Sequence, residues 1–207
     1  MALVKAKKGT LPPVVEAEAA SLEDADPAQR RRAAHEAAGR AEAVAPLAGR
    51  LAREDDASVR EAILTALVRT GSAEAAGALI PFLASEDVGL RNGAIESLQQ
   101  MPAAVVMPEV APLLTDGDSD VRIFAAQLVG HLPHPDRLPL LTGVVERDPH
   151  VNVCLAAVEA LVEIGHPNAL PSLERLVARF PDDPFVGFSV ESARHRFTED
   201  PERDLGA

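Results

Sequence analysis

The chain has 207 residues, of which 47% are apolar and 3% aromatic, and a formal net charge of −12. The acidic balance argues against a general nucleic-acid binder and against an anionic membrane surface, because both need clustered Lys and Arg. With no Trp or Tyr, Ala and Leu must build the core, which favours close packing of helices over a β-sandwich. We therefore predict an all-α protein.

The N-terminal stretch differs from the rest of the chain. Residues 1–20 contain all three lysines, Lys5, Lys7 and Lys8, followed by Pro12 and Pro13, where a signal segment would be apolar. We predict a flexible arm there, a repeat domain over residues 21–197 and an acidic tail over residues 198–207. No run of about 18 apolar residues follows, and we predict a cytoplasmic protein.

One well-marked helix is predicted between Asp55 and Gly71. Asp56 or Ser58 can cap its first turn, and Gly71 can end it in the left-handed conformation. Between them, apolar residues recur at three- and four-residue spacing, which gives the helix one apolar face. These residues are Val59, Ile63, Ala66 and Leu67.

Versions of this helix recur about every 31 residues. The apolar-Arg pair Val59-Arg60 has counterparts at Arg31, Arg91 and Arg122, and Cys154 takes the arginine position in a fifth unit. An apolar position follows each arginine by seven residues, at Ala38, Leu67, Leu98 and Val129. Such a period is typical of stacked repeats.

Each unit carries a second helical pattern after a Gly or Pro breaker. Pro108, Pro139 and Pro171 are predicted in the first turn of these helices, where the missing N–H is harmless. Pro81 and Pro112 come deeper in their helices and are predicted to bend them. The unit is therefore a helical hairpin followed by an acidic loop.

This unit resembles the short HEAT-like repeats of the type found in phycobilin lyases. The resemblance rests on Asp118 to Arg122 with Ala125, Ala126 and Gly130, and on Asp148 to Gly165. It covers about residues 22–197. It implies a right-handed α-solenoid of about five to six HEAT-like helical hairpins. In its last unit, four phenylalanines are predicted to cap the core: Phe180, Phe185, Phe188 and Phe197.

The repeated arginines are predicted to form a ladder of ion pairs. An aspartate precedes each by four residues, in the pairs Asp56 and Arg60, Asp87 and Arg91, and Asp118 and Arg122. Each arginine can meet its own aspartate or that of the next unit. We interpret this ladder as structural.

Other reactive residue types receive structural interpretations too. We predict that Cys154 is packed and inert, that His35-Glu36 is a surface feature, and that Asp116–Asp120 caps a helix. His131, His134 and His166 are expected in turns beside prolines. No complete catalytic or metal-ligand set is present, so we expect no catalysis, no cofactor and no metal.

In such solenoids the second helices line the concave face, where we predict that another protein binds. The candidate partner-binding residues are Arg50, Arg53, Arg137, Arg147, Glu174, Arg175 and Arg179. Arginine suits this role because its planar fork pairs with carboxylates. These positions could equally be the charged residues of a solvated helix face.

Three functions follow from these patterns. The first is a non-catalytic scaffold or adaptor in a bacterial regulatory or signalling assembly. The alternative is a phycobilin lyase-type subunit that acts on bilin-carrying proteins, although Tyr and Trp to line a tetrapyrrole pocket are absent. A DNA-repair glycosylase-like protein would require a basic concave face.

Overall fold

The computed structural model describes residues 21–199, and within that range the chain forms helices without strands. By its internal contacts the chain divides into two compact units, Met1–Ala78 and Leu79–Ala207. The predicted arm over residues 1–20 lies outside the described residues, as do residues 200–207 of the predicted tail. The prediction of an all-α protein is confirmed for residues 21–199.

The first unit is built around α4, to which both α2 and α3 pack. As predicted, the Asp56 carboxylate caps α4 by accepting from the backbone N–H of Ser58 and Val59, and Gly71 ends it with φ 58°. The elements are α2 (Pro27–Glu36), η1 (Ala41–Ala43), α3 (Val44–Leu51), α4 (Ala57–Thr70) and α5 (Ala73–Leu79), which reaches the unit boundary.

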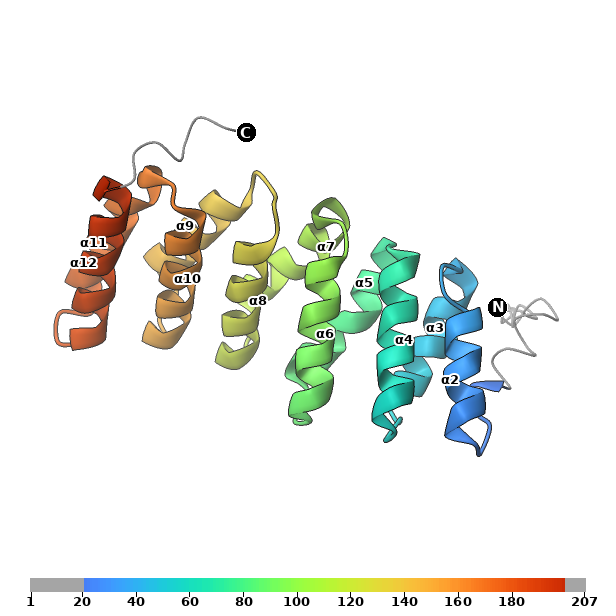
Figure 1. Cartoon of the computed structure of the whole chain (residues 1–207). Coiled ribbons are helices and arrows are strands. Elements are labelled where there is room, and N and C mark those ends of the chain that lie inside the picture. Colours follow the sequence, from blue (N-terminus) through green and yellow to red (C-terminus); the bar gives the residue numbers. More distant parts are fainter. Residues whose placement is uncertain (1–20, 200–207) are drawn as a thin grey trace, which may run out of the picture. The chain divides into compact units, whose positions relative to one another are not determined.

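The second unit has two layers of helices (Figure 1). We call the helices of one layer first helices: α6 (Val88–Gln100), α8 (Ser119–His131), α10 (Val151–Ile164) and the terminal α12 (Pro184–Glu199). The second helices behind them are α7 (Ala103–Val110), α9 (Arg137–Arg147) and α11 (Leu170–Arg179), with 3-10 turns η2 (Ile80–Ala84), η3 (Ala111–Thr115) and η4 (Pro167–Ala169). Helix α10 packs on α8, α9 and α12.

Small residues set the distance between first helices, as the composition predicted. A Cβ placed on Gly130 of α8 would lie 2.5 Å from the Cβ of Ala160 on α10, closer than van der Waals contact allows. Ala125 and Ala157 are fully buried beside them. The α8–α10 contact therefore depends on the absence of a side chain at Gly130.

The prolines of the second helices only partly behave as predicted. Pro171 lies at the start of α11 and Pro139 in the first turn of α9, but Pro108 lies inside α7 and not in its first turn. Pro81 and Pro112 stand at the starts of η2 and η3. Because proline removes a backbone donor, the chain there tightens from α into 3-10 turns.

The predicted phenylalanine cap is wrong for two of its four residues. Phe185 and Phe188 are 70% and 74% exposed on α12, whereas Phe197 is buried. The stripe that α12 buries consists of Val186, Val190, Ala193 and Phe197. This stripe follows the helical period, and Phe185 and Phe188 fall outside it.

Candidate functional site

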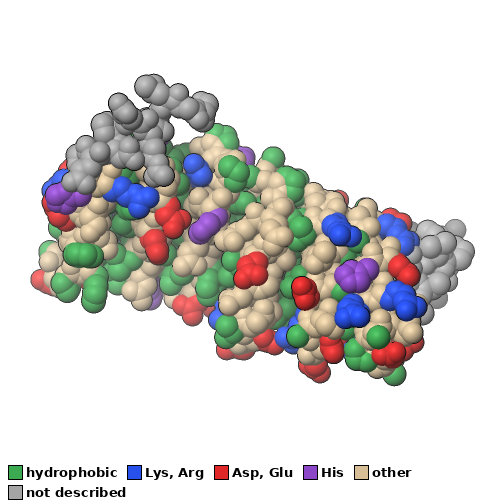
Figure 2. Space-filling view, in the orientation of Figure 1, with side chains coloured by type: hydrophobic (Ala, Val, Ile, Leu, Met, Phe, Trp, Pro, Cys, Tyr) green, Lys and Arg blue, Asp and Glu red, His purple; other side chains and the backbone are tan. Residues whose placement is uncertain are grey.

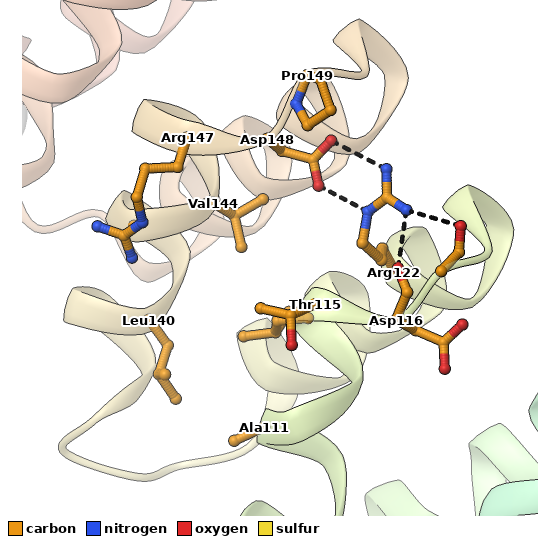
Figure 3. Close-up of a pocket in the computed structure, with 12 residues that line it drawn as sticks. Ala111, Thr115, Asp116, Arg122, Leu140, Val144, Arg147, Asp148 and Pro149 are labelled. Atoms are coloured by element: carbon orange, nitrogen blue, oxygen red, sulfur yellow. Dashed lines mark hydrogen bonds and ion pairs between the residues drawn. The ribbon is translucent and has the colours of Figure 1, made fainter.

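A groove of about 440 Å³ opens in the second unit between η3 and α9 (Figure 3). We call it the α9 groove. Its walls are largely apolar, with Ala111 and Leu114 on η3, and Leu140 and Val144 on α9. The remaining lining residues are Thr115, Asp116, Gly117, Arg122, Gly143, Arg147, Asp148 and Pro149. The second helices thus provide a concave, mainly apolar surface with a few charged groups, a common character of binding sites.

A buried ion pair closes one end of the α9 groove. The Arg122 Nε and Nη2 donate to the two carboxylate oxygens of Asp148 at 2.7 and 3.2 Å, and Nη1 donates to the carbonyl oxygens of Asp116 and Gly117 at 2.9 and 3.4 Å. Asp148 follows α9, so the pair joins consecutive repeats. At Arg122 this confirms the predicted ion pair, in the form that uses an aspartate of the next unit.

The electrostatics of this pair favour the ionised state. Burial acts to raise the pKa of Asp148, but hydrogen bonds from Arg122 and from the His150 N–H outweigh it and hold that pKa below its usual range. The same pairing raises the pKa of Arg122. The pair is therefore charged and internally satisfied, and it leaves little for a ligand to bind.

The first unit repeats this geometry at Arg30, which corrects the predicted register. Arg30 Nε and Nη2 donate to Glu54 at 2.8 and 2.9 Å, and Nη1 donates to the carbonyls of Asp24 and Ala25. Arg31, the predicted ladder residue, is exposed. The sequence Arg30-Arg31-Arg32 offered three candidates, and only helix phase selects the one that faces the next repeat.

Glu54 is the most strongly held carboxylate among the described residues. Arg30 and then Arg50 donate to it, as does the backbone N–H of Asp56. These bonds outweigh burial and lower the pKa of Glu54. Arg50, a predicted partner-binding residue, is thereby engaged inside the first unit.

The ladder arginines Arg60 and Arg91 share one contact with Arg30 and Arg122. Each donates to a backbone carbonyl six residues earlier, Glu54 for Arg60 and Ser85 for Arg91. The guanidinium of Arg91 also lies 5.3 Å from the Phe124 ring centroid, and its buried Nε has no hydrogen-bond partner. The carbonyl contact is thus common to all four arginines.

In the fifth unit another helix supplies the missing guanidinium. The Cys154 thiol lies 3.4 Å from the Asp148 carbonyl, again six residues earlier. Arg179 of α11 reaches the same carbonyl at 2.6 Å and also donates to the carbonyl of Val145. Burial raises the pKa of Cys154, and the thiol is fully buried. The prediction of a packed cysteine is confirmed.

Arg147 differs from the other arginines of the groove. It is exposed, and its side chain makes no hydrogen bond or ion pair to any residue in the range 21–199. It lies across Gly143, where an added Cβ would meet Nη2 at 2.3 Å. Gly143 was not predicted as a site residue, although a glycine inside a predicted helix, four residues before an arginine, is a sequence signal of a packing or functional constraint.

Most other predicted partner-binding residues are engaged in contacts within their own unit. Arg53 pairs with Glu23, Arg175 with Glu146, and Glu174 with Arg194. Arg137 lines a separate hollow of about 410 Å³ with His134 and His166. Of the seven predicted residues, Arg147 is the one that lines the α9 groove.

The remaining polar motifs have local structural roles. Asp116 accepts from the Asp118 N–H, and Asp118 accepts from the Asp120 N–H, so the predicted capping is confirmed. His134 and His166 each accept a backbone N–H in a turn. His35 is exposed on α2, over which basic and histidine side chains gather (Figure 2). Across residues 21–199, His, Cys, Asp and Glu form no group of three that could hold a metal.

Comparison with known proteins identifies the repeat. A family model for HEAT repeats matches residues 15–99 and 107–187. The chain belongs to the HEAT-repeat family. Together with the stacked hairpins of each unit, this match confirms the predicted α-solenoid fold class. No curated protein matches the sequence, and no helix within residues 21–199 is long and apolar enough to span a membrane.

Several solved structures are similar to the chain, and the first of those below, with a TM-score above 0.5, supports the fold class. A chain from a structural study of microtubule plus-end tracking has 11% identity and a TM-score of 0.59, over 90% of both chains. Human deoxyhypusine hydroxylase has 18% identity and a TM-score of 0.45, over 91% of this chain and 86% of that one. The phycocyanin lyase CpcE–CpcF complex from Nostoc sp. PCC7120 has 19% identity and a TM-score of 0.36, over 95% and 99%. These likenesses concern fold alone.

Proposed function

We propose that this HEAT-repeat protein is a non-catalytic scaffold that binds another protein through its second helices. The observation that carries the proposal is the α9 groove, an apolar depression on the second helices beside an exposed arginine with no ion-pair partner within residues 21–199. Interface centres combine apolar surface with arginine in this way.

The polar groups of the described residues support binding more than catalysis. The Cys154 thiol is buried with a raised pKa, whereas a nucleophile needs a lowered one. The buried carboxylates of Glu54 and Asp148 are bound by arginines in structural pairs. We do not propose the lyase alternative, because nothing in the α9 groove favours a tetrapyrrole.

The setting we propose is a cytoplasmic regulatory or signalling assembly in a bacterium, with the partner on the concave face of the solenoid. A scaffold is often encoded beside the proteins that it holds. We expect the neighbouring genes in the source genome to include a regulatory protein, and a neighbourhood of bilin-attachment genes would contradict this setting.

Site-specific crosslinking tests the proposed binding surface. A photoreactive residue would replace Leu140 in the α9 groove or, as a matched control, exposed Glu159 on first helix α10. We expect the full-length chain in its own cells to crosslink one defined protein from position 140 and not from 159. Equal crosslinking from both positions, or none from position 140, would contradict the proposal.

A further inference from the structure

The charge pattern of the second unit separates its two layers of helices. First helices α6, α8 and α10 carry four acidic residues, Glu96, Asp120, Glu159 and Glu163, and the two ladder arginines Arg91 and Arg122, while terminal first helix α12 adds two glutamates and two arginines. Second helices α7, α9 and α11 carry four arginines against three glutamates: Arg137, Arg147, Arg175 and Arg179 against Glu109, Glu146 and Glu174. The second-helix layer is therefore the more positive part of an acidic unit.

Within that layer, Arg147 is the cation available at the α9 groove. Arg175 and Arg179 are held by Glu146 and by backbone carbonyls respectively. Arg122, at the end of the groove, is neutralised by Asp148. The neighbouring carboxylate of Glu146 accepts from Ser172 and Arg175, and these bonds, together with the nearby charges of Arg175 and Arg147, lower its pKa. Among the described residues that line the groove, Arg147 is thus the arginine whose guanidinium makes no hydrogen bond.

The opposite rim of the groove carries a carboxylate, but one whose charge is partly offset. Asp116 lines that rim, accepts the Asp118 N–H and interacts electrostatically with the Arg122 guanidinium, which also binds its backbone carbonyl. Between Asp116 and Arg147 the surface is apolar, formed by Ala111, Leu140 and Val144 (Figure 3). The complementary ligand therefore combines an apolar side chain with a nearby carboxylate.

We propose, building on the scaffold function above, that the α9 groove binds an acidic peptide segment of the partner protein. A glutamate or aspartate of that segment accepts two N–H groups from the Arg147 guanidinium, in the bidentate geometry that favours arginine at such sites. A neighbouring leucine-sized side chain covers Ala111, Leu140 and Val144. Gly143 contributes by leaving room for the guanidinium to lie flat against α9.

A displayed library of random dodecapeptides, selected on the full-length chain, tests this inference. We expect the wild-type chain to enrich sequences with an acidic residue near a large apolar one. The Arg147→Glu variant should lose that preference, and the best peptide should bind it at least about tenfold more weakly by fluorescence anisotropy. The matched Arg196→Glu variant changes an exposed arginine of first helix α12 outside the groove, and it should bind the peptide within about twofold of wild type.

Three results would overturn the inference. The wild-type chain could select basic peptides, the Arg147→Glu variant could select the same acidic peptides as wild type, or the chain could enrich no peptide above the level seen with uncoated beads. Arg147→Ala, which removes the guanidinium without adding a charge, should weaken the selected peptide in the same direction. Crosslinking from position 140 tests the scaffold function separately. If a protein is crosslinked there but the chain selects no acidic peptides, the scaffold function stands and the proposal of an acidic peptide ligand is wrong.

Discussion

Arg122 and Arg147 border the same groove and differ in almost every physical respect. Arg122 is buried and donates to a carboxylate and to two carbonyls, whereas Arg147 is exposed and unpaired within residues 21–199. The repeat thus uses arginine for two purposes. Arg122, which follows the period, fixes one hairpin to the next, whereas Arg147 lies outside the period and makes no hydrogen bond or ion pair within residues 21–199.

The largest loss of stability is expected when the buried arginine, Arg122, is replaced. Arg122→Ala leaves the buried Asp148 carboxylate uncompensated, so we expect the free energy of unfolding to fall by about 3 kcal/mol. Arg147→Ala, an exposed site, should change it by less than about 0.5 kcal/mol. Urea denaturation followed by circular dichroism measures both, and equal losses would remove the distinction.

The Cys154 position tests the structural role of the ladder arginines, because there the guanidinium comes from Arg179. Arg179→Ala should cost about 1 to 2 kcal/mol, since the carbonyls of Val145 and Asp148 lose their donor. Adding Cys154→Arg in that background should recover part of the loss, whereas Cys154→Arg alone should destabilise. Additive effects in this double-mutant cycle would show that Arg179 does not replace a ladder arginine.

A smaller loss of stability is expected at acidic pH. Because folding lowers the pKa of Asp148 and of Glu54, their contribution to stability is present above the unfolded-state pKa values, 3.8 for aspartate and 4.5 for glutamate. It is lost as pH falls below them towards the folded values. Thermal unfolding between pH 7 and 3 should show this fall, and Asp148→Asn should make it shallower. A pH profile of Asp148→Asn parallel to wild type would contradict the assignment.

The smallest effect on stability concerns Gly143. Alanine there should stabilise α9 by up to about 1 kcal/mol through helix propensity, while its Cβ displaces the Arg147 guanidinium. We therefore expect Gly143→Ala to raise the free energy of unfolding and to weaken binding of the selected peptide. Unchanged peptide affinity in Gly143→Ala would mean that the guanidinium position does not matter.

Local patterns predicted the fold because each repeat contacts mainly its neighbours. The cap at Asp56 and the end at Gly71 follow from residue chemistry alone, and both were predicted. The register at Arg30 was missed because three consecutive arginines are equivalent in sequence, and only the position of Glu54 distinguishes them. Helix phase likewise decides that Phe185 is exposed while Phe197 is buried.

The α9 groove could be predicted only in part. Second helices were expected to carry the binding residues, and Arg147 was among them. The groove itself depends on the distance between η3 and α9 and on the side chains that fail to fill it, such as Gly143 and Ala111. Neither quantity is local in sequence, and the contacts that hold Arg179 against the carbonyls of Val145 and Asp148 are not local either.

Hydrogen exchange of the full-length chain with and without the selected peptide tests the central claim most directly. We predict that binding slows exchange in residues 111–117 and in α9 with the turn after it (residues 137–149), which together carry most of the groove lining, and leaves α10 (Val151–Ile164) unchanged. Protection confined to the first helices, or absent from residues 137–149, would contradict the assignment of recognition to the second helices.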